Sequence, residues 1–473
     1  MRFLIMIGLI FALAGCVTRF GGGEAGRGSD VAATRIPNAV RVLREADGWK
    51  AHFHFSDDAA IWAFRRSALL RNGQRPWRPA SWEVLTPGVR LERIGDFDAF
   101  VARDGIVPRQ VTIRFRPLAE DLIADYDPAI ILSDGRFALY GGHFSAFPMD
   151  ARATLAVLSE PADYPTRVAM RASGVPMLFH GQRVLEVDDV GDSYVFIGDV
   201  TLTPEDRVAT ILDPGLPDWI MADLRDYTPN VFRAFADQMG PHKSHRPTII
   251  ASWAGTKFKG HSTGGSVSPG LITMRIEGEE LLKVTPASLR TMRWFIAHEA
   301  AHFWLGETIG YTTPDDAWIT EGGADYLAMR FSESTDPHYD AGAFISSART
   351  DCAVSLKKGS LAEARRRGDQ RAYYACGTLF ALAVDRAGRG RGETYHDFVR
   401  GLIESDADRK VTSAEWFAAA RKFGVAGPAI ARMHALVAGT PDAAAAIDAL
   451  MAVDVQPTSS VSALAIAATE VGA

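Results

Sequence analysis

A pair of histidines constrains this 473-residue chain more than any other feature of its sequence. His298 and His302 stand four residues apart, and Glu299 directly follows the first of them. Thr285 and Pro286, a typical helix start, precede apolar residues at helical spacing, so all three fall on a predicted helix. Side chains four residues apart project from the same helix face, where two imidazoles can bind one metal ion. The pattern therefore predicts a helix that carries a metal site, with Glu299 placed to act as a general base.

A third candidate ligand, Glu321, follows His302 after eighteen residues, within a second predicted helix. Three protein ligands that leave one position open are typical of catalytic zinc, and imidazole with carboxylate suits Zn²⁺ better than it suits thiophilic metals. Gly322 and Gly323 each cost a helix about 1 kcal/mol, which a close approach of two helices would explain. Asp325, one turn after Glu321, either accepts the second N–H of a ligand histidine or is an exposed helix residue.

The sequence around these ligands resembles that of a known family. The resemblance rests on HEAAHFWLG at residues 298–306, on WITEG at residues 318–322 and on GLIT at residues 270–273. In these stretches, and over about residues 264–377, the chain is similar to the membrane alanyl aminopeptidase family of gluzincin zinc peptidases. The resemblance implies a bound Zn²⁺ with the ligands His298, His302 and Glu321.

The resemblance also implies the catalytic side chains. Glu299 corresponds to the general base that activates water for attack on a peptide carbonyl. Tyr374 resembles the transition-state tyrosine of the family, and a donor of this kind stabilises the oxyanion by about 2.7–4 kcal/mol. The neighbouring Tyr373 is the alternative match, and a tyrosine with no catalytic role is the other alternative.

One part of the family pattern is missing from this chain. The aminopeptidases of the family carry a glutamate, just before the Gly-Leu-Ile-Thr strand, that binds the free α-amine of the substrate. The corresponding residues here are Gly264, Gly265, Ser266 and Val267, with Val267 at the acidic position. An apolar side chain cannot neutralise an ammonium group. We expect this segment to bind an extended peptide through its backbone, and a glycine-rich loop without a substrate role is the alternative.

The amino-terminal residues are typical of an export signal. Arg2 precedes an apolar run at residues 3–12 that is too short to span a bilayer in the mature protein. Leu-Ala-Gly-Cys then ends at Cys16 and resembles the lipobox of bacterial lipoproteins, which implies lipidation of Cys16. The alternative is an ordinary cleaved signal followed by an unrelated cysteine. Val17 is not the aspartate of an inner-membrane retention signal, so we expect a lipid anchor in the outer membrane, facing the periplasm.

Export affects the two remaining cysteines, since disulfides persist outside the cytosol. Cys352 and Cys376 would be the only cysteines left once Cys16 is acylated. We expect them to form a disulfide, and two separate buried thiols are the alternative.

Charge and hydropathy patterns set the remaining expectations. Lys and Arg number 51 against 57 Asp and Glu, a net charge of −6, so no basic excess favours a nucleic-acid partner. Short alternating strands dominate the first half of the chain and amphipathic helices the second, which predicts an α+β chain with a thermolysin-like, mostly helical zinc-peptidase domain. The expected parts are a signal peptide (1–15), a flexible tether (16–35), a β-sheet-rich domain (36–204), the catalytic domain (205–390), a helical extension (391–455) and a poorly structured tail (456–473).

These observations favour hydrolysis of peptide bonds in peptides or small proteins. The family resemblance favours an aminopeptidase, and the missing acidic residue leaves an endopeptidase open. A non-catalytic envelope scaffold that binds a partner protein is the alternative of another class, against which the intact Glu299 argues.

Overall fold

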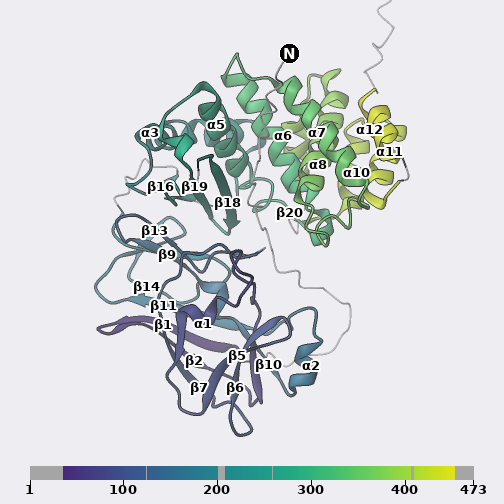
Figure 1. The fold of residues 1–473 in the computed structure, drawn as a ribbon. Helices are drawn as coiled ribbons and strands as arrows, with labels where there is room; N and C mark the ends of the chain where they lie inside the picture. The colour runs from purple at the N-terminus through teal and green to yellow at the C-terminus, as the bar shows by residue number, and fades with distance from the viewer. Residues whose placement is uncertain are drawn as a thin grey trace, which may run out of the picture.

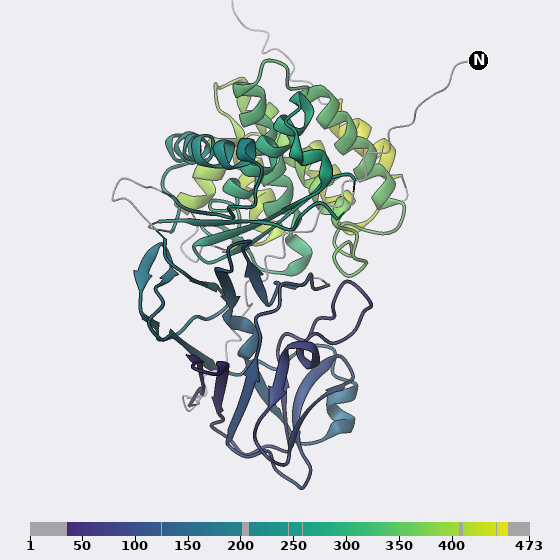
Figure 2. The same ribbon diagram turned by 60° about the vertical axis from the view of Figure 1, so that its left-hand side comes forward.

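The computed structural model describes residues 36–452 apart from 124, 201–207, 245, 258, 406–409 and 441. The expected signal peptide, the tether with Cys16 and the carboxy-terminal tail lie outside these residues, as does the expected domain boundary at residue 204. The described chain forms a lobe of β-sheets and a lobe of helices around a smaller sheet (Figures 1 and 2). Within it, no helix has the length and the apolar content that crossing a membrane requires.

Three sheets make up the N-terminal lobe. The first consists of β14 (Glu186–Val187), β11 (Thr166–Ala172), β1 (Asn38–Glu45), β2 (Gly48–His54), β7 (Gln110–Phe115) and β4 (Trp82–Val84) in that order. The second consists of β10 (Ala146–Met149), β3 (Ile61–Phe64), β6 (Phe97–Ala102) and β5 (Val89–Ile94). The third consists of β13 (Gln182–Val184), β12 (Met177–Phe179), β15 (Tyr194–Ile197), β9 (Phe137–Tyr140) and β8 (Ala129–Ile131). Three short helical turns join them: α1 (Arg78–Ser81), η1 (Gly141–Phe144) and α2 (Arg152–Ala156).

The sequence pattern of this lobe produces its strands as predicted. In β7, Val111, Ile113 and Phe115 are buried, while the alternate residues are at least partly accessible to solvent. Strands β8 and β9 form a hairpin and pair antiparallel across a turn where Gly135 has a φ of +86°. Between the sheets lies an aromatic core in which, for example, Phe55 stacks on Trp62 with 4.1 Å between ring centroids.

The helical lobe is built on a four-stranded sheet in the order β16 (Ala209–Leu212), β17 (Thr248–Trp253), β19 (Leu271–Glu277) and β18 (Ser262–Ser268). These four strands lie in the part of the chain where the sequence pattern predicts mainly helices. β18 is the antiparallel edge strand, so residues 264–267 form a strand and not a glycine-rich loop, and their substrate role stays a prediction. Its STGGSVS sequence lacks the apolar alternation that marks a strand, and pairing with the buried β19 imposes the extended conformation instead.

Helices cover this sheet and extend away from it (Figure 1). They are α3 (Asp218–Asp226), α4 (Thr228–Met239), η2 (Glu279–Leu282), α5 (Pro286–Ala301), η3 (Pro314–Asp316), α6 (Trp318–Thr335), α7 (Ala341–Leu356), α8 (Gln370–Arg389), α9 (Tyr395–Ser405), α10 (Ser413–Lys422), α11 (Gly427–Ala438) and α12 (Ala443–Met451). A short parallel pair, β20 (Gly310–Tyr311) and β21 (Lys410–Val411), joins the α5–α6 connection to the segment before α10. The structure joins α7 to α8 by a disulfide between Cys352 and Cys376, whose Cα atoms are 5.0 Å apart.

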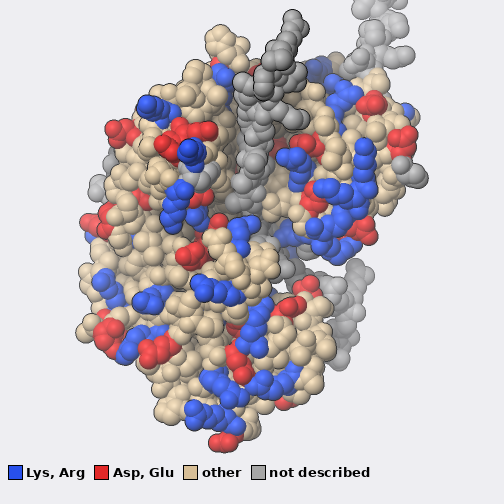
Figure 3. All heavy atoms as spheres, in the orientation of Figure 1, with Lys and Arg blue, Asp and Glu red and all other residues tan. Residues whose placement is uncertain are grey.

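The face drawn in Figure 3 carries side chains of both charge signs on both lobes. This distribution agrees with the nearly balanced charge of the whole sequence.

Candidate metal centre

Helix α5 carries two of the three candidate ligands. It begins as predicted, because the Thr285 side chain accepts from the Ser288 N–H at 3.0 Å while the Ser288 side chain accepts from the Thr285 N–H at 2.8 Å. Its other end is buried in the lobe, where His298 is 3% exposed and His302, at the helix terminus, is 0% exposed. The ligand pair therefore lies at the buried end of a helix whose start is capped.

Helix α6 brings the third ligand to the same place. Glu321 lies in its first turn and is buried. A Cβ added to Gly322 would stand 2.3 Å from the backbone of Gly377 on α8, and one added to Gly377 would stand 2.2 Å from the Trp318 carbonyl oxygen. The glycines thus allow two helix backbones to touch, which confirms the predicted reason for Gly322 and sets Glu321 beside α8.

The three ligand atoms form a small triangle. His298 Nε2 and His302 Nε2 are 3.1 Å apart, and Glu321 Oε2 lies 3.3 Å from the second and 3.7 Å from the first. Ligands at about 2.0–2.1 Å from a tetrahedral zinc ion stand about 3.3 Å from one another. Glu321 Oε2 is buried and has no hydrogen-bond partner among the described residues. The side chains therefore fit a zinc ion, and these three residues are the one group of potential ligands found in the described chain.

The remaining imidazole nitrogens face acceptors. His302 Nδ1 lies 2.9 Å from the Leu305 carbonyl oxygen, to which its N–H can donate. His298 Nδ1 lies 2.8 Å from Asp325 Oδ1, and Asp325 is only 7% exposed. Both contacts favour the tautomer in which Nε2 is free to bind a metal. Of the two alternatives for Asp325, the structure thus places it beside a ligand histidine and not on an exposed helix face.

The electrostatics of the three ligand residues match a cation site. Burial raises the pKa of Glu321, but the neighbouring His302 outweighs it, so the net shift is below the ordinary value. Burial lowers the pKa of His302, but Glu321 and Glu299 raise it to about 9 overall. Glu321 thus holds a negative charge that a proton on His302 or a metal ion can neutralise. A bound zinc ion would polarise a peptide carbonyl and lower the pKa of a coordinated water to about 7.

Glu299 lies between this centre and strand β18. It is 1% exposed, and a Cβ added to Gly265 would stand 2.2 Å from Glu299 Oε1. Only glycine at position 265 lets the strand backbone approach this carboxylate so closely. The sequence placed Glu299 correctly, but the contact with Gly265 depends on tertiary packing.

Of the two tyrosines on α8, Tyr374 is the one that contacts the centre. Its ring stacks on His298 with 5.7 Å between centroids, and a hydrogen bond from its side chain contributes to the lowered pKa of Glu321. Tyr373 does not take this position and packs against Tyr374 with tilted rings, 5.3 Å between centroids. This arrangement favours Tyr374 over Tyr373 as the oxyanion donor.

Val267 is a core residue of the helical lobe, and the expected backbone pairing of residues 264–267 with a substrate stays a prediction. Its side chain is 1% exposed and packs in the core of the helical lobe, so it does not line a substrate site. The hydrophobic residue at the position of the family's acidic group therefore serves packing. Its carbonyl oxygen accepts a hydrogen bond of 2.6 Å from the Tyr126 hydroxyl of the N-terminal lobe, a contact that sequence reasoning missed.

Two cavities adjoin these residues. One of about 510 Å³ is lined by Asp325 and Tyr374 together with the apolar side chains of Trp294, Phe344 and Ala348. The other, of about 230 Å³, lies between the lobes and is lined by Tyr126, Asp127 and residues 264–266. The sequence did not single out Trp294 and Phe344 as cavity residues, because apolar residues at helical spacing ordinarily belong to the hydrophobic core.

Comparison with known proteins agrees with this site. Residues 258–366 match the model of the Peptidase family M1 domain. An aminopeptidase N family protein from Idiomarina loihiensis is similar in structure, with a TM-score of 0.51 and 13% identity over 78% of this chain and 70% of that one. An M1 zinc metallopeptidase from Deinococcus radiodurans, crystallised as a variant with a Tyr-Ser-Ala substrate, gives a TM-score of 0.48 and 14% identity over 86% and 94% of the two chains. Leukotriene A4 hydrolase from Saccharomyces cerevisiae has a TM-score of 0.46 and 12% identity, over 82% of this chain and 64% of that one. The search of curated proteins found no match.

Fold and site together define a zinc metallopeptidase. The fold is the two-domain M1 fold, a β-rich N-terminal lobe followed by a helical catalytic lobe, and the zinc ligands are His298, His302 and Glu321.

Proposed function

We propose that this chain is a lipid-anchored peptidase of the bacterial cell envelope that removes residues from the amino ends of peptides or small proteins. The observation that carries the proposal is the convergence of two imidazoles, one carboxylate and the buried Glu299 beside a glycine-rich edge strand. The M1 domain match supports the aminopeptidase character.

Each side chain of the centre has a role in this reaction. Glu299 accepts a proton from the attacking water and returns it to the leaving amine. Tyr374 donates to the oxyanion that develops on the peptide carbonyl. Asp325 and the Leu305 carbonyl fix the two imidazoles. The backbone of Gly265 lies where an extended substrate can pair beside Glu299.

The proposed anchor rests on the amino-terminal sequence. The short apolar run and the tetrad that ends in Cys16 support lipidation, and Val17 supports an outer-membrane location facing the periplasm. Several acyl chains on one cysteine would anchor the protein stably.

Endopeptidase action is the second candidate, and one observation favours it. The buried Val267 stands where the resemblance expects the carboxylate that binds a free α-amine. An enzyme without that carboxylate has less reason to require a free amino end.

The test uses the chain from residue 17 onward and the variant Glu299→Gln. We expect about one zinc ion per molecule in both proteins, and turnover of a peptide library that falls by about 10²–10⁴-fold in the variant. Zinc-loaded wild type that cleaves no peptide would refute the proposed function. Library peptides with free and with acetylated amino ends then separate the candidates, because an aminopeptidase leaves the acetylated set intact.

A further inference from the structure

Strand β18 offers a free edge beside the catalytic carboxylate. Among the strands that the structure describes, it is the last of its sheet, and it pairs with β19 alone. In an antiparallel pair the N–H and C=O of one residue point the same way, and the direction alternates along the strand. Gly265 and Val267 are two residues apart, so their carbonyls face the same side. The donor to Val267 comes from the N-terminal lobe and not from β19, which places both carbonyls on the free edge.

Tyr126, the donor to Val267, is fixed by contacts of its backbone and of its ring. Its backbone N–H donates to Asp125 Oδ1 at 2.9 Å, and its carbonyl lies 2.8 Å from His143 Nε2. Its ring stacks on Tyr140 with 4.5 Å between centroids. Burial raises the pKa of Tyr126 above its ordinary value, so the phenol remains an O–H donor.

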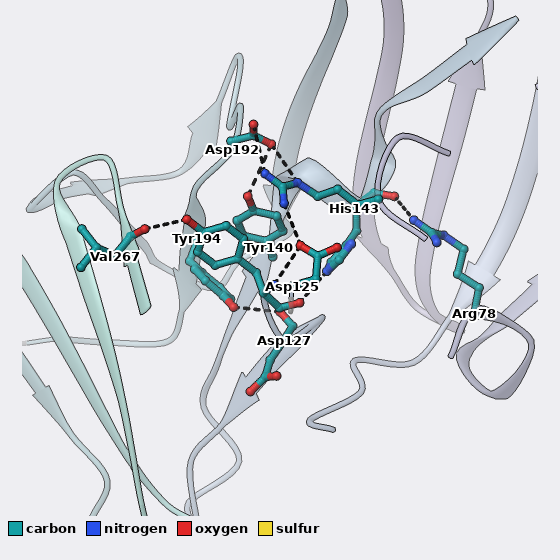
Figure 4. Close-up of polar contacts among 10 residues, drawn as sticks. Arg78, Asp125, Asp127, Tyr140, His143, Asp192, Tyr194 and Val267 are labelled. Atoms are coloured by element: carbon teal, nitrogen blue, oxygen red, sulfur yellow. Dashed lines mark hydrogen bonds and ion pairs between the residues drawn. The ribbon is translucent and has the colours of Figure 1, made fainter. Parts of the chain in front are cut away.

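Charged groups behind the ring make this arrangement rigid. The Arg66 guanidinium lies 2.7 Å from Asp125 and 3.4 Å from Asp192, and 5.1 Å from the centroid of the Tyr126 ring. Figure 4 shows Asp125, Asp192 and Tyr140 gathered behind the hydroxyl that reaches Val267. A substrate that displaced Tyr126 would have to disturb these contacts, which include the buried ion pair of Arg66 with Asp125.

We propose that Tyr126 caps the peptide-pairing edge of β18. An extended substrate pairs with Gly265 beside Glu299 but cannot continue to Val267, whose carbonyl is already taken. The cap therefore limits the number of substrate residues on one side of the scissile bond. This inference rests on the proposed peptidase function and adds a length limit to it.

The cavity between the lobes agrees with such a limit. Tyr126, Asp127 and residues 264–266 line a space of about 230 Å³. Pockets for whole drug-sized ligands are larger, about 300–1,000 Å³. The space at the capped end thus suits a single side chain better than a continuing peptide.

Two series of peptides with one common cleavable bond test the cap on the zinc-loaded enzyme. One series grows at the amino end and the other at the carboxyl end, one residue at a time. In zinc-loaded Glu299→Gln, which does not trim the added residues, one series should stop gaining in affinity once a residue passes the cap. Adding Tyr126→Phe to this variant should restore that step by about three- to tenfold, the value of one hydrogen bond, and leave the other series unchanged.

Tyr194→Phe is the matched control. It removes a buried hydroxyl of the same aromatic cluster whose acceptor, the Asp127 carbonyl at 2.9 Å, is in the N-terminal lobe. Added to Glu299→Gln in the same way, we expect it to leave the length profile unchanged. Cleavage of the same peptides by zinc-loaded wild type separates recognition from turnover.

The outcomes are distinguishable. Equal length profiles of Glu299→Gln with and without Tyr126→Phe would overturn the cap and leave the peptidase standing. If the variant with Tyr126→Phe fails to fold, the profiles of Glu299→Gln alone decide, because a steady gain in both series contradicts a cap. A zinc-loaded wild type that cleaves neither series would overturn the proposed function, and the cap with it.

Discussion

Each lobe contains a buried polar cluster, and the two clusters differ in where their positive charge comes from. In the N-terminal lobe, the buried Arg66 lies 2.7 Å from the buried Asp125 and 3.4 Å from Asp192 at the exposed edge of the cluster, so the chain supplies the cation itself. In the catalytic lobe, Glu321 faces two imidazoles and keeps a carboxylate oxygen without a hydrogen-bond partner among the described residues. A buried carboxylate is stable only when it is compensated. The first cluster is therefore complete as folded, and the second needs a proton or a metal ion.

This difference predicts where substitutions act. Changes in the catalytic cluster should affect turnover or zinc binding and leave the fold intact. Changes in the N-terminal cluster should affect stability and leave zinc binding intact. The predictions below challenge this division, in order of decreasing effect.

The largest effect is expected for Tyr374→Phe. Removing an oxyanion donor costs about 10²–10³-fold in kcat, with zinc content and KM nearly unchanged. Steady-state kinetics and metal analysis of the purified variant check this result. Tyr373→Phe is the control, since Tyr373 packs against Tyr374 with tilted rings, and the kcat of this variant should change by less than about threefold. A larger loss for Tyr373→Phe than for Tyr374→Phe would reverse the assignment.

Gly265→Ala should have the next largest effect. The added Cβ would stand 2.2–2.6 Å from the Glu299 carboxylate, so either the strand or the base must move. A displacement of about 1 Å costs about 10²-fold in turnover. The control is Gly401→Ala on α9, where an added Cβ meets nothing within 4 Å. Kinetics and zinc content are measured for both, and full activity of Gly265→Ala would show that Glu299 is not confined by β18.

Asp325→Asn should weaken zinc binding by about 10- to 100-fold, because the amide no longer fixes His298 as a charged acceptor does. Competition with a chelator of known affinity measures the change. Turnover at saturating zinc should stay close to wild type. The comparable change Asp192→Asn in the N-terminal lobe should leave the zinc affinity unchanged. If both variants bound zinc more weakly, the two clusters would not act separately.

The sequence predicted the catalytic cluster because its geometry is local. His298 and His302 share a helix face at a fixed spacing, Glu321 lies in the next long helix, and helix periodicity alone relates these side chains. Gly322 is a poor helix former, so its place within a predicted helix indicated a close contact with another helix. In the structure that contact is with Gly377. The strands with alternating residues, such as β7, were predictable for the same reason.

The N-terminal cluster and β18 could not be predicted in this way. Arg66 and Asp192 are 126 residues apart, and Tyr126 and Val267 are 141 residues apart, so no short pattern relates them. The β18 sequence is rich in glycine and serine, whose intrinsic preference is for turns. The burial of the Val267 side chain could not be predicted either, because it depends on packing against residues distant in the sequence.

The smallest effect concerns stability and pH, and it compares the lobes through two buried histidines. Burial lowers the pKa of His143 in the N-terminal lobe to about 4 and that of His396 in the catalytic lobe to about 4. A folded state that excludes a proton is fully stable above the unfolded pKa of about 6.5 and loses stability as the pH falls toward 4. Between pH 6.5 and 5 each histidine should cost its lobe about 1–2 kcal/mol.

His143→Gln removes this titration and keeps an N–H that can reach the Tyr126 carbonyl, which lies 2.8 Å from His143 Nε2. Urea unfolding at both pH values should therefore show a weaker pH dependence in the N-terminal lobe of this variant than in wild type. His396→Gln should weaken the pH dependence of the catalytic lobe instead. If His143→Gln keeps the wild-type slope, protonation of His143 does not limit the acid stability of its lobe. In that case the folded N-terminal lobe accommodates a protonated His143 beside Arg66. The carboxylates of this cluster would then be able to compensate a second positive charge.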